Sequence, residues 1–148
     1  MRNYGLAVLG LSETIWNQAG QLTLPSGKVI LFSGHKEDGA AHTHGVALML
    51  SRKVAKSLVC WEAVSLRIVT AKFATNQKIK VSIIQCCAPT NDAEESKKEE
   101  FYSALQDVLD KERRKDITII MGDFIAKIGS DNTSYQKVME KAWFGRYE

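Results

Sequence analysis

Cysteine is scarce in this sequence, and long apolar runs are absent from it. Only three cysteines occur in 148 residues, and none is spaced as a C-x-x-C pair. This pattern excludes a disulfide framework and is typical of a reducing compartment, so we expect an intracellular protein of the nucleus or cytoplasm. The apolar runs fall well short of the roughly 20 residues that span a membrane, and the N-terminus shows no signal-peptide pattern, so no membrane association is expected.

Glycine-rich nucleotide motifs are missing as well. No segment matches a Walker-type phosphate loop or a dinucleotide fingerprint. The net charge is +3, with basic residues spread along the sequence. This charge permits a phosphate-bearing partner without indicating one, because a nucleic-acid interface needs a concentrated basic patch. The cations of residues 111–115 are interpreted either as a solvated helix end or as a contact with a DNA backbone.

The length and composition predict one globular domain with mixed secondary structure. The chain is 45% hydrophobic and 25% charged, which is ordinary for a folded protein. Its patterning predicts strands over residues 4–11, 29–33, 46–51, 58–62, 66–73 and 79–86, with a polar hairpin or loop at 18–28 and a helical turn at 52–57. We therefore expect an α/β (α+β) domain.

Two helices are predicted in the second half of the chain. The first begins with Asn91 or Asp92 as its N-cap and ends at the cations of residues 111–115. Its apolar face consists of residues at helical spacing, namely Phe101, Leu105, Val108 and Leu109. The second is a short helix over residues 135–143.

An unbroken apolar run at residues 117–121 leads into Gly122 and Asp123. Such a run after a helix predicts a strand buried on both faces, with Asp123 at the edge of the sheet where α/β folds place ligands. The apolar run at residues 6–11 is likewise followed by an acid, Glu13, whose position after its strand matches that of Asp123. We expect neighbouring central strands of one sheet to bring these two carboxylates to the same edge, as a site for a divalent metal or a phosphate. The simpler interpretation of Asp123 alone is a turn or helix-cap residue.

Four motifs give the sequence a family resemblance. They are SETIW at residues 12–16, GVALMLS at 45–51, CAPTN at 87–91 and GDFI at 122–125. In this order they resemble the endonuclease/exonuclease/phosphatase superfamily, and within it the endonuclease domain of LINE-type (non-LTR) retrotransposons. The resemblance implies a partial four-layer sandwich of mixed β-sheets with flanking helices. It also implies that residues 1–148 form a single truncated domain lacking the C-terminal part of that fold.

The resemblance also implies a chemistry, phosphodiester hydrolysis in DNA. It places Glu13 at the metal-binding glutamate and Asp123 at the aspartate that orients or deprotonates the attacking water, with a share in the metal site. Thr90 and Asn91 would lie at the substrate phosphate. The implied cofactor is Mg²⁺, weakly held, or Mn²⁺.

Three positions depart from the family pattern. Ile15 replaces a basic residue, Cys87 replaces a tyrosine, and Ile125 replaces an asparagine. The family's opening strand, with its metal-site asparagine, and its closing aspartate–histidine motif fall outside the sequence. We therefore expect a degenerate enzyme with weak or no activity. The alternative is a non-catalytic remnant or binding module, whose exposed sheet pairs with a protein partner or with a second copy.

Two further clusters have competing interpretations. The three histidines His35, His42 and His44 lie in one segment with Glu37 and Asp38, which suggests either a zinc site or a solvated loop. No structural-zinc spacing is present, and the loop is preferred. The adjacent pair Cys86 and Cys87 is interpreted either as a redox pair or, preferably, as a core residue of a strand beside a substituted position.

Overall fold

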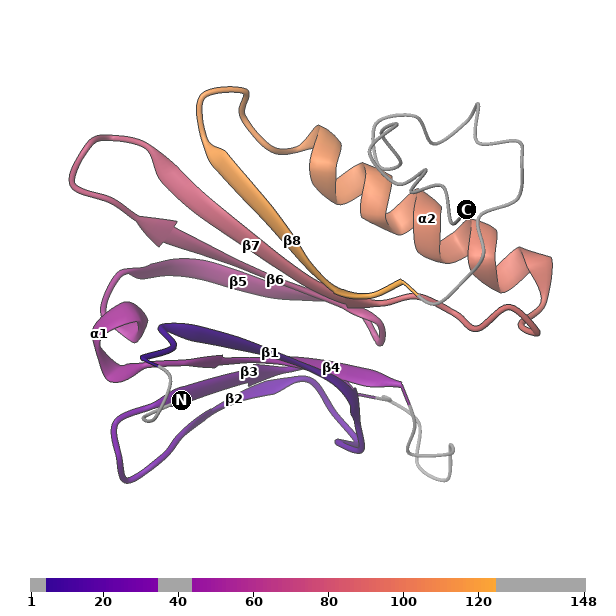
Figure 1. Cartoon of the computed structure of the whole chain (residues 1–148), viewed down its shortest axis with the longest axis horizontal. Coiled ribbons are helices and arrows are strands. Elements are labelled where there is room, and N and C mark those ends of the chain that lie inside the picture. Colours follow the sequence, from indigo (N-terminus) through magenta and orange to yellow (C-terminus); the bar gives the residue numbers. More distant parts are fainter. Residues whose placement is uncertain (1–4, 35–43, 125–148) are drawn as a thin grey trace, which may run out of the picture.

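Two β-sheets packed face to face form the centre of the computed structural model (Figure 1), which describes residues 5–34 and 44–124. Sheet A has the strand order β1-β4-β3-β2, and sheet B has the order β5-β6-β7-β8. The strands of sheet A are β1 (Val8–Thr14), β2 (Gly20–Thr23), β3 (Val29–Phe32) and β4 (Gly45–Leu50). Those of sheet B are β5 (Leu58–Ser65), β6 (Ile68–Ala74), β7 (Lys80–Cys87) and β8 (Ile117–Asp123).

Two helices connect these strands in the described part of the chain. The short helix α1 (Arg52–Ala55) joins sheet A to sheet B, and α2 (Glu95–Asp110) joins β7 to β8. Because α2 carries the chain back along the sheet, β8 pairs with β7 in parallel, whereas every other pair is antiparallel. The predicted mixed architecture is therefore confirmed. No helix among the described residues is long and apolar enough to cross a membrane.

Alternating side chains build the core between the two sheets. The inner faces contribute Leu31, Leu48 and Leu50 from sheet A, and Val69 and Phe73 from sheet B, all in one buried cluster. The neighbouring residues along each strand point outward, as the two-residue period of a strand requires. Both sheets thus contribute to one core. The inner face of each sheet is buried by the inner face of the other.

The outer face of sheet B is covered by α2. Phe101, Leu105 and Val108 of the helix pack against Ile84 and other outward-facing residues of the sheet. The apolar stripe predicted from the sequence is therefore confirmed. The helix begins later than predicted, with Glu94 as its N-cap and no side-chain capping bond. A turn closed by the Ala93 N–H and the Thr90 carbonyl precedes it, so the predicted cap residues lie in that turn.

Strand β8 is an edge strand, and the prediction that both its faces are buried is wrong. It pairs only with β7 among the described residues, and Ile117, Ile119 and Ile120 are 52%, 43% and 36% exposed. The apolar run was correctly assigned to a strand, but residue type alone does not distinguish a central strand from an edge strand. The exposed apolar edge expected from the sequence is present here.

Other differences are shifts of element boundaries. Strand β1 runs over Val8–Thr14 and not over residues 4–11, because its pairing with β4 continues past Leu11 to Thr14. The polar segment 18–28 was predicted to be a hairpin or a loop. It contains β2 and a turn, and β2 pairs with β3 as a hairpin. The predicted helix at 135–143 lies outside the described residues.

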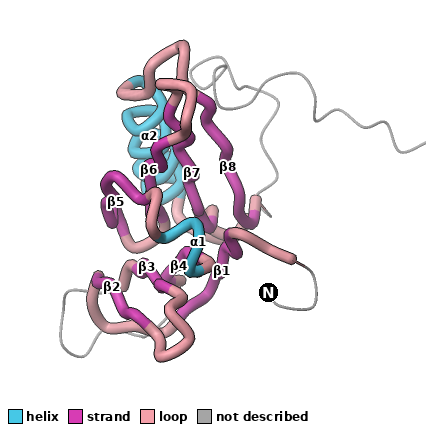
Figure 2. The backbone as a smooth tube through the Cα atoms, turned by 90° about the vertical axis from the view of Figure 1, so that its left-hand side faces the viewer, coloured by secondary structure: helices cyan, strands magenta, loops and turns pink. Residues whose placement is uncertain are grey.

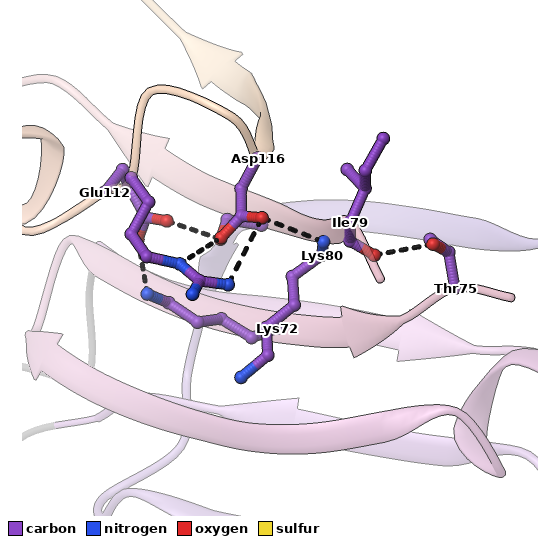
Figure 3. Close-up of polar contacts among 8 residues, drawn as sticks. Lys72, Thr75, Ile79, Lys80, Glu112 and Asp116 are labelled. Atoms are coloured by element: carbon purple, nitrogen blue, oxygen red, sulfur yellow. Dashed lines mark hydrogen bonds and ion pairs between the residues drawn. The ribbon is translucent and has the colours of Figure 1, made fainter. Parts of the chain in front are cut away.

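A polar network joins the α2–β8 connection to the strands beneath it (Figure 3). Glu112 accepts a 2.7 Å hydrogen bond from Ser82 Oγ and forms a 2.9 Å ion pair with Lys72. Asp116 accepts the Lys80 backbone N–H at 3.0 Å and binds Arg113 Nε at 2.9 Å. These bonds hold the start of β8 against β7, so they set the register that carries Asp123 to the end of the sheet.

Asp116 makes the fold sensitive to acid. Its pKa lies below the usual 3.8, chiefly because it accepts the Lys80 N–H and the Arg113 side-chain bond. A depressed folded-state pKa means that the stabilisation is present above pH 3.8 and is lost as the pH falls through the folded-state value. We predict that Asp116→Asn destabilises the protein at neutral pH and that the difference from wild type narrows below about pH 4. Urea unfolding between pH 2 and 7 measures this, and a difference independent of pH would contradict it.

Candidate active site

The two predicted catalytic carboxylates reach one end of the molecule from different sheets. Glu13 lies in β1 at an edge of sheet A, and Asp123 ends β8 at an edge of sheet B. The prediction that they lie on neighbouring central strands of one sheet is therefore wrong. Their convergence is retained, because face-to-face packing sets β1 against β7 and β8. In Figure 1 both strands end on the right-hand side of the sandwich.

A β-bulge directs Glu13 away from regular strand geometry. The pairing of β1 with β4 shifts between Leu11 and Thr14, so β1 has one extra residue there. Glu13 itself has φ 56°, a left-handed conformation that is unfavourable for a residue with a Cβ. Such strain is of the order of 1 kcal/mol and persists only where the surroundings enforce it. Bulges and strained residues of this kind often orient side chains beside functional sites.

Gly122 allows β8 to lie unusually close to β7. It pairs with Cys86 and has φ 153°, and a Cβ added there would lie 1.9 Å from the Cys86 carbonyl oxygen. The glycine is therefore needed for close approach within the strand. One residue on, Asp123 pairs with Cys87, and its carbonyl accepts the Ala88 N–H at 2.9 Å.

The Cys87 thiol is near enough to both carboxylates to be affected by their charges. Its pKa is raised, first by burial and then by the negative charges of Asp123 and Glu13, whereas the Arg67 cation and the Glu13 backbone N–H lower it. Glu13 and Asp123 therefore both lie in the electrostatic neighbourhood of this thiol. The side chain is only 5% exposed and belongs to the inter-sheet core. The residue that stands in place of the family's tyrosine is thus a buried thiol with no hydroxyl to offer a phosphate.

Arg67 fastens the loop that leaves this point. Its Nη1 donates to the carbonyl oxygens of Cys87 and Ala88 at 3.2 and 3.4 Å, and its own carbonyl accepts the Cys87 N–H at 3.0 Å. Sequence reasoning missed this residue. The signal available was a single cation in the short connection between two strands, which does not by itself identify a partner 20 residues away.

Gln85 links the two sheets beside the carboxylates. Its side chain is buried at 3% exposure and donates a 3.1 Å hydrogen bond to Ser12 Oγ. Gly10 makes room for it, since a Cβ at that position would lie 2.0 Å from Gln85 Oε1. The sequence did contain a signal for this contact, a single amide side chain within the apolar strand segment 83–86. A buried polar group of this kind requires a hydrogen-bond partner.

The remaining predicted site residues are spread around this end of the molecule. Thr90 and Asn91 are exposed in the loop after Cys87. Ile15 is 71% exposed just beyond β1, so the position of the family's basic residue faces solvent with an apolar side chain. Ile125 lies outside the described residues.

The described residues contain no cluster of three or more His, Cys, Asp and Glu side chains that could hold a metal ion. Glu13 and Asp123 would each offer one carboxylate to such an ion. This matches the minimal protein contribution to a Mg²⁺ site, in which water and substrate phosphate complete the shell. The donor set therefore fits a weakly held Mg²⁺ and does not fit a preformed, fully protein-ligated site. Two of the three histidines of the alternative zinc site lie outside the described residues.

The cysteines are free thiols. Cys86 is fully buried under α2, and burial raises its pKa to about 12, so its assignment as a core residue is confirmed. A thiol with so high a pKa is almost entirely protonated at neutral pH, which argues against reactive redox chemistry at this pair.

Comparisons with known proteins agree with this architecture. No family model matches the chain. Craniofacial development protein 2 from Bos taurus and from Tragulus javanicus are each 29% identical over 130 residues, covering 88% of this chain but 21% and 22% of those proteins. The human Nocturnin catalytic domain with bound sulfate anion superimposes with a TM-score of 0.54 at 16% identity, over 84% of this chain and 53% of that one.

These likenesses establish the fold. The chain has a mixed α+β, endonuclease/exonuclease/phosphatase-like fold and spans about half of the solved domain it resembles. It spans about a fifth of the curated relatives.

The convergence of the carboxylates can be tested through Cys87. We predict that Asp123→Asn lowers the pKa of Cys87, because it removes a negative charge that raises it. At a fixed pH near 8, iodoacetamide should therefore alkylate Cys87 faster in the variant than in wild type. Peptide mass spectrometry follows the site-specific rate in a Cys60→Ser background, which removes the exposed thiol.

Arg67→Gln is the matched control for this prediction. It removes a cation that lowers the same pKa, so alkylation should slow. Equal rates in all three proteins would show that these charges do not surround the thiol.

Proposed function

We propose that this chain derives from a divalent-metal-dependent DNA endonuclease of LINE-type retrotransposon origin and retains weak or no phosphodiester hydrolysis. The observation that supports the proposal is that two packed sheets bring the strands of Glu13 and Asp123 together at one end of the molecule, where both charges affect the Cys87 thiol. The likeness to the Nocturnin catalytic domain supports a nuclease-like fold. That domain carries a bound sulfate, an anion similar to phosphate in shape.

The roles follow from the chemistry of the carboxylates. Glu13 and Asp123 would hold Mg²⁺, or Mn²⁺, which when bound supplies positive charge to a phosphate and lowers the pKa of bound water. Asp123 would orient and deprotonate the attacking water. Thr90 and Asn91, exposed in the loop fastened by Arg67, would face the substrate phosphate.

Weak activity follows from the groups that are replaced. Removing one preorganised hydrogen-bond donor from a transition state lowers the rate by roughly 10²–10³. Removing a general acid or base lowers it by roughly 10²–10⁴. Cys87 and Ile125 replace two polar groups of the family pattern. Even if these losses overlap, the chain should act close to background.

Supercoiled-plasmid nicking tests the proposal. We predict slow nicking that requires Mg²⁺ or Mn²⁺, and at least a tenfold loss of it in Glu13→Ala, because that change removes a metal-binding carboxylate. Glu62→Ala is the control, since it removes an exposed carboxylate from β5, on the opposite edge of sheet B. Nicking that persists in Glu13→Ala would come from another source and would refute the assigned role.

The alternative function is a binding module that pairs the edge of β8 with another strand. The exposed Ile117, Ile119 and Ile120 favour it, because natural edge strands are usually protected by charge or proline. A partner strand could come from another protein or from a second copy of this chain.

Edge pairing between copies makes a separate prediction. We expect wild type to self-associate at concentrations of tens of micromolar and Ile119→Lys to remain monomeric, because an edge lysine opposes strand pairing. Val59→Lys is the control, since Val59 is a 48% exposed residue on the other edge of sheet B. Sedimentation velocity reports the oligomeric state, and a wild type that is monomeric throughout would exclude this form of pairing.

A further inference from the structure

Four connections meet at the end of the sandwich opposite the carboxylates. They are the β2–β3 turn (24–28), the α1 segment (51–57), the β6–β7 turn (75–79) and the α2–β8 connection (111–116). Strand register places them together, because Val29 pairs with Leu50, Leu58 with Phe73, and Val81 with Ile117. They lie at the left of Figure 1, and Figure 2 views this end directly, with α1 between the two sheets. We call this surface the basic end.

Contacts between these connections join them into one continuous surface. The Ala74 N–H donates to the Ser57 carbonyl at 2.8 Å, which joins the β6–β7 turn to α1. The Arg52 side chain packs over Gly27, where a Cβ would lie 2.9 Å from its Cδ. The Lys80 N–H donates to Asp116 and so joins β7 to the α2–β8 connection.

The basic end carries most of the positive charge of the described residues. Segment α1 contributes Arg52, Lys53 and Lys56, all of them exposed. The two turns and the residue after the second turn contribute Lys28, Lys78 and Lys80.

The α2–β8 connection adds further cations. They are Lys111, Arg113, Arg114 and Lys115, all exposed. The two acids of these four connections are neutralised within the fold, because Glu112 pairs with Lys72 and Asp116 pairs with Arg113. The side chains of Glu112 and Asp116 are 9% and 4% exposed, so the surface presented to solvent is cationic.

Among the described residues, the other end of the sandwich carries a group of acids. Glu13 and Asp123 lie there, and Asp92, Glu94 and Glu95 stand exposed in the loop and first turn leading into α2. Cations that are dispersed in the sequence are thus gathered by the fold at one end, whereas the exposed acids at the other end are accompanied there by Lys97 and Lys98. A polyanion is attracted to the basic end and repelled by the carboxylate end.

We propose that the basic end binds the phosphate backbone of nucleic acid, at a surface separate from the carboxylate site. The two ends are separated by the length of the strands. A strand of about seven residues, with a rise of about 3.3 Å per residue, is roughly 25 Å long. Binding at the basic end therefore does not depend on Glu13 or Asp123. The inference goes beyond the proposed nuclease function, and it holds whether or not catalysis survives.

The side chains between the cations favour nucleic acid over a membrane. Ser26, Asn76 and Gln77 lie among them, and hydroxyl and amide groups are common donors to backbone phosphates alongside Lys and Arg. Membrane-surface segments instead place Trp, Phe or Leu beside their basic residues. None of the four connections contains an aromatic residue, and their one leucine, Leu24, packs against the buried cluster of Ile30, Phe32 and Ala47.

Fluorescence anisotropy with a labelled 20-base-pair duplex tests the proposal at 50–200 mM NaCl without divalent metal. Lys53→Glu/Lys56→Glu and Arg114→Glu/Lys115→Glu should each weaken binding at least tenfold at 100 mM salt. Each pair should also reduce the slope of log K against log salt concentration by about 2, since roughly one counterion is released per phosphate contact. Circular dichroism checks that each variant is folded. Lys53→Gln/Lys56→Gln removes the two charges without reversing them, and it should weaken duplex binding by a smaller factor.

Lys97→Glu/Lys98→Glu is the matched control, because it alters net charge equally on the first turns of α2, at the other end. It should change binding by less than about threefold. The proposal is overturned if the control weakens binding as much as the basic-end pairs do. It is equally overturned if wild type shows no salt-dependent binding, or if it binds phosphatidylserine vesicles more tightly than the duplex. Loss of nicking in Glu13→Ala with unchanged duplex affinity separates this surface from the carboxylate site.

Discussion

The burial of two inner sheet faces against each other is the constraint on which the rest of this structure depends. Each sheet supplies half of one apolar core, so the inward residues of β3 and β4 fit against those of β6 and β7. This packing sets β1 of one sheet against β8 of the other and brings Glu13 and Asp123 to a common end. No hydrogen-bonded ladder joins these two strands. The candidate site is therefore a product of packing between sheets, and the Gln85–Ser12 hydrogen bond is one of the polar contacts that align them.

The same topology separates charge along the strands. Antiparallel pairing and the return through α2 place the strand-to-strand turns and α1 at one end, where lysines and arginines are concentrated. The acids of the α2 loop and of the site collect at the other end. Cations of the described residues at that end are already engaged, because Arg67 donates to two carbonyls and Lys97 and Lys98 form ion pairs with Glu94 and Glu95. This arrangement is consistent with weak catalysis and with binding of nucleic acid elsewhere on the molecule.

Local strain at the site shows how closely the backbone is held. Glu13 adopts a left-handed conformation inside a bulge, and Gly122 brings β8 within contact distance of the Cys86 carbonyl. Regular strands would place neither residue in this way. The network around Glu112 and Asp116 fixes the start of β8 in register with β7, so that these departures occur at the strand's far end.

Sequence by itself determined the elements with strong local signals. The β-branched runs formed strands, the apolar stripe from Phe101 to Val108 covered a sheet, and the order of four motifs indicated the fold. It did not determine that β8 is an edge strand, that the carboxylates belong to different sheets, or that Gln85 and Arg67 support the site. Only the tertiary structure decided these points. Hydrophobic periodicity records which face of a strand is buried, whereas strand order, sheet packing and the gathering of distant charges arise from contacts between residues that are far apart in the chain.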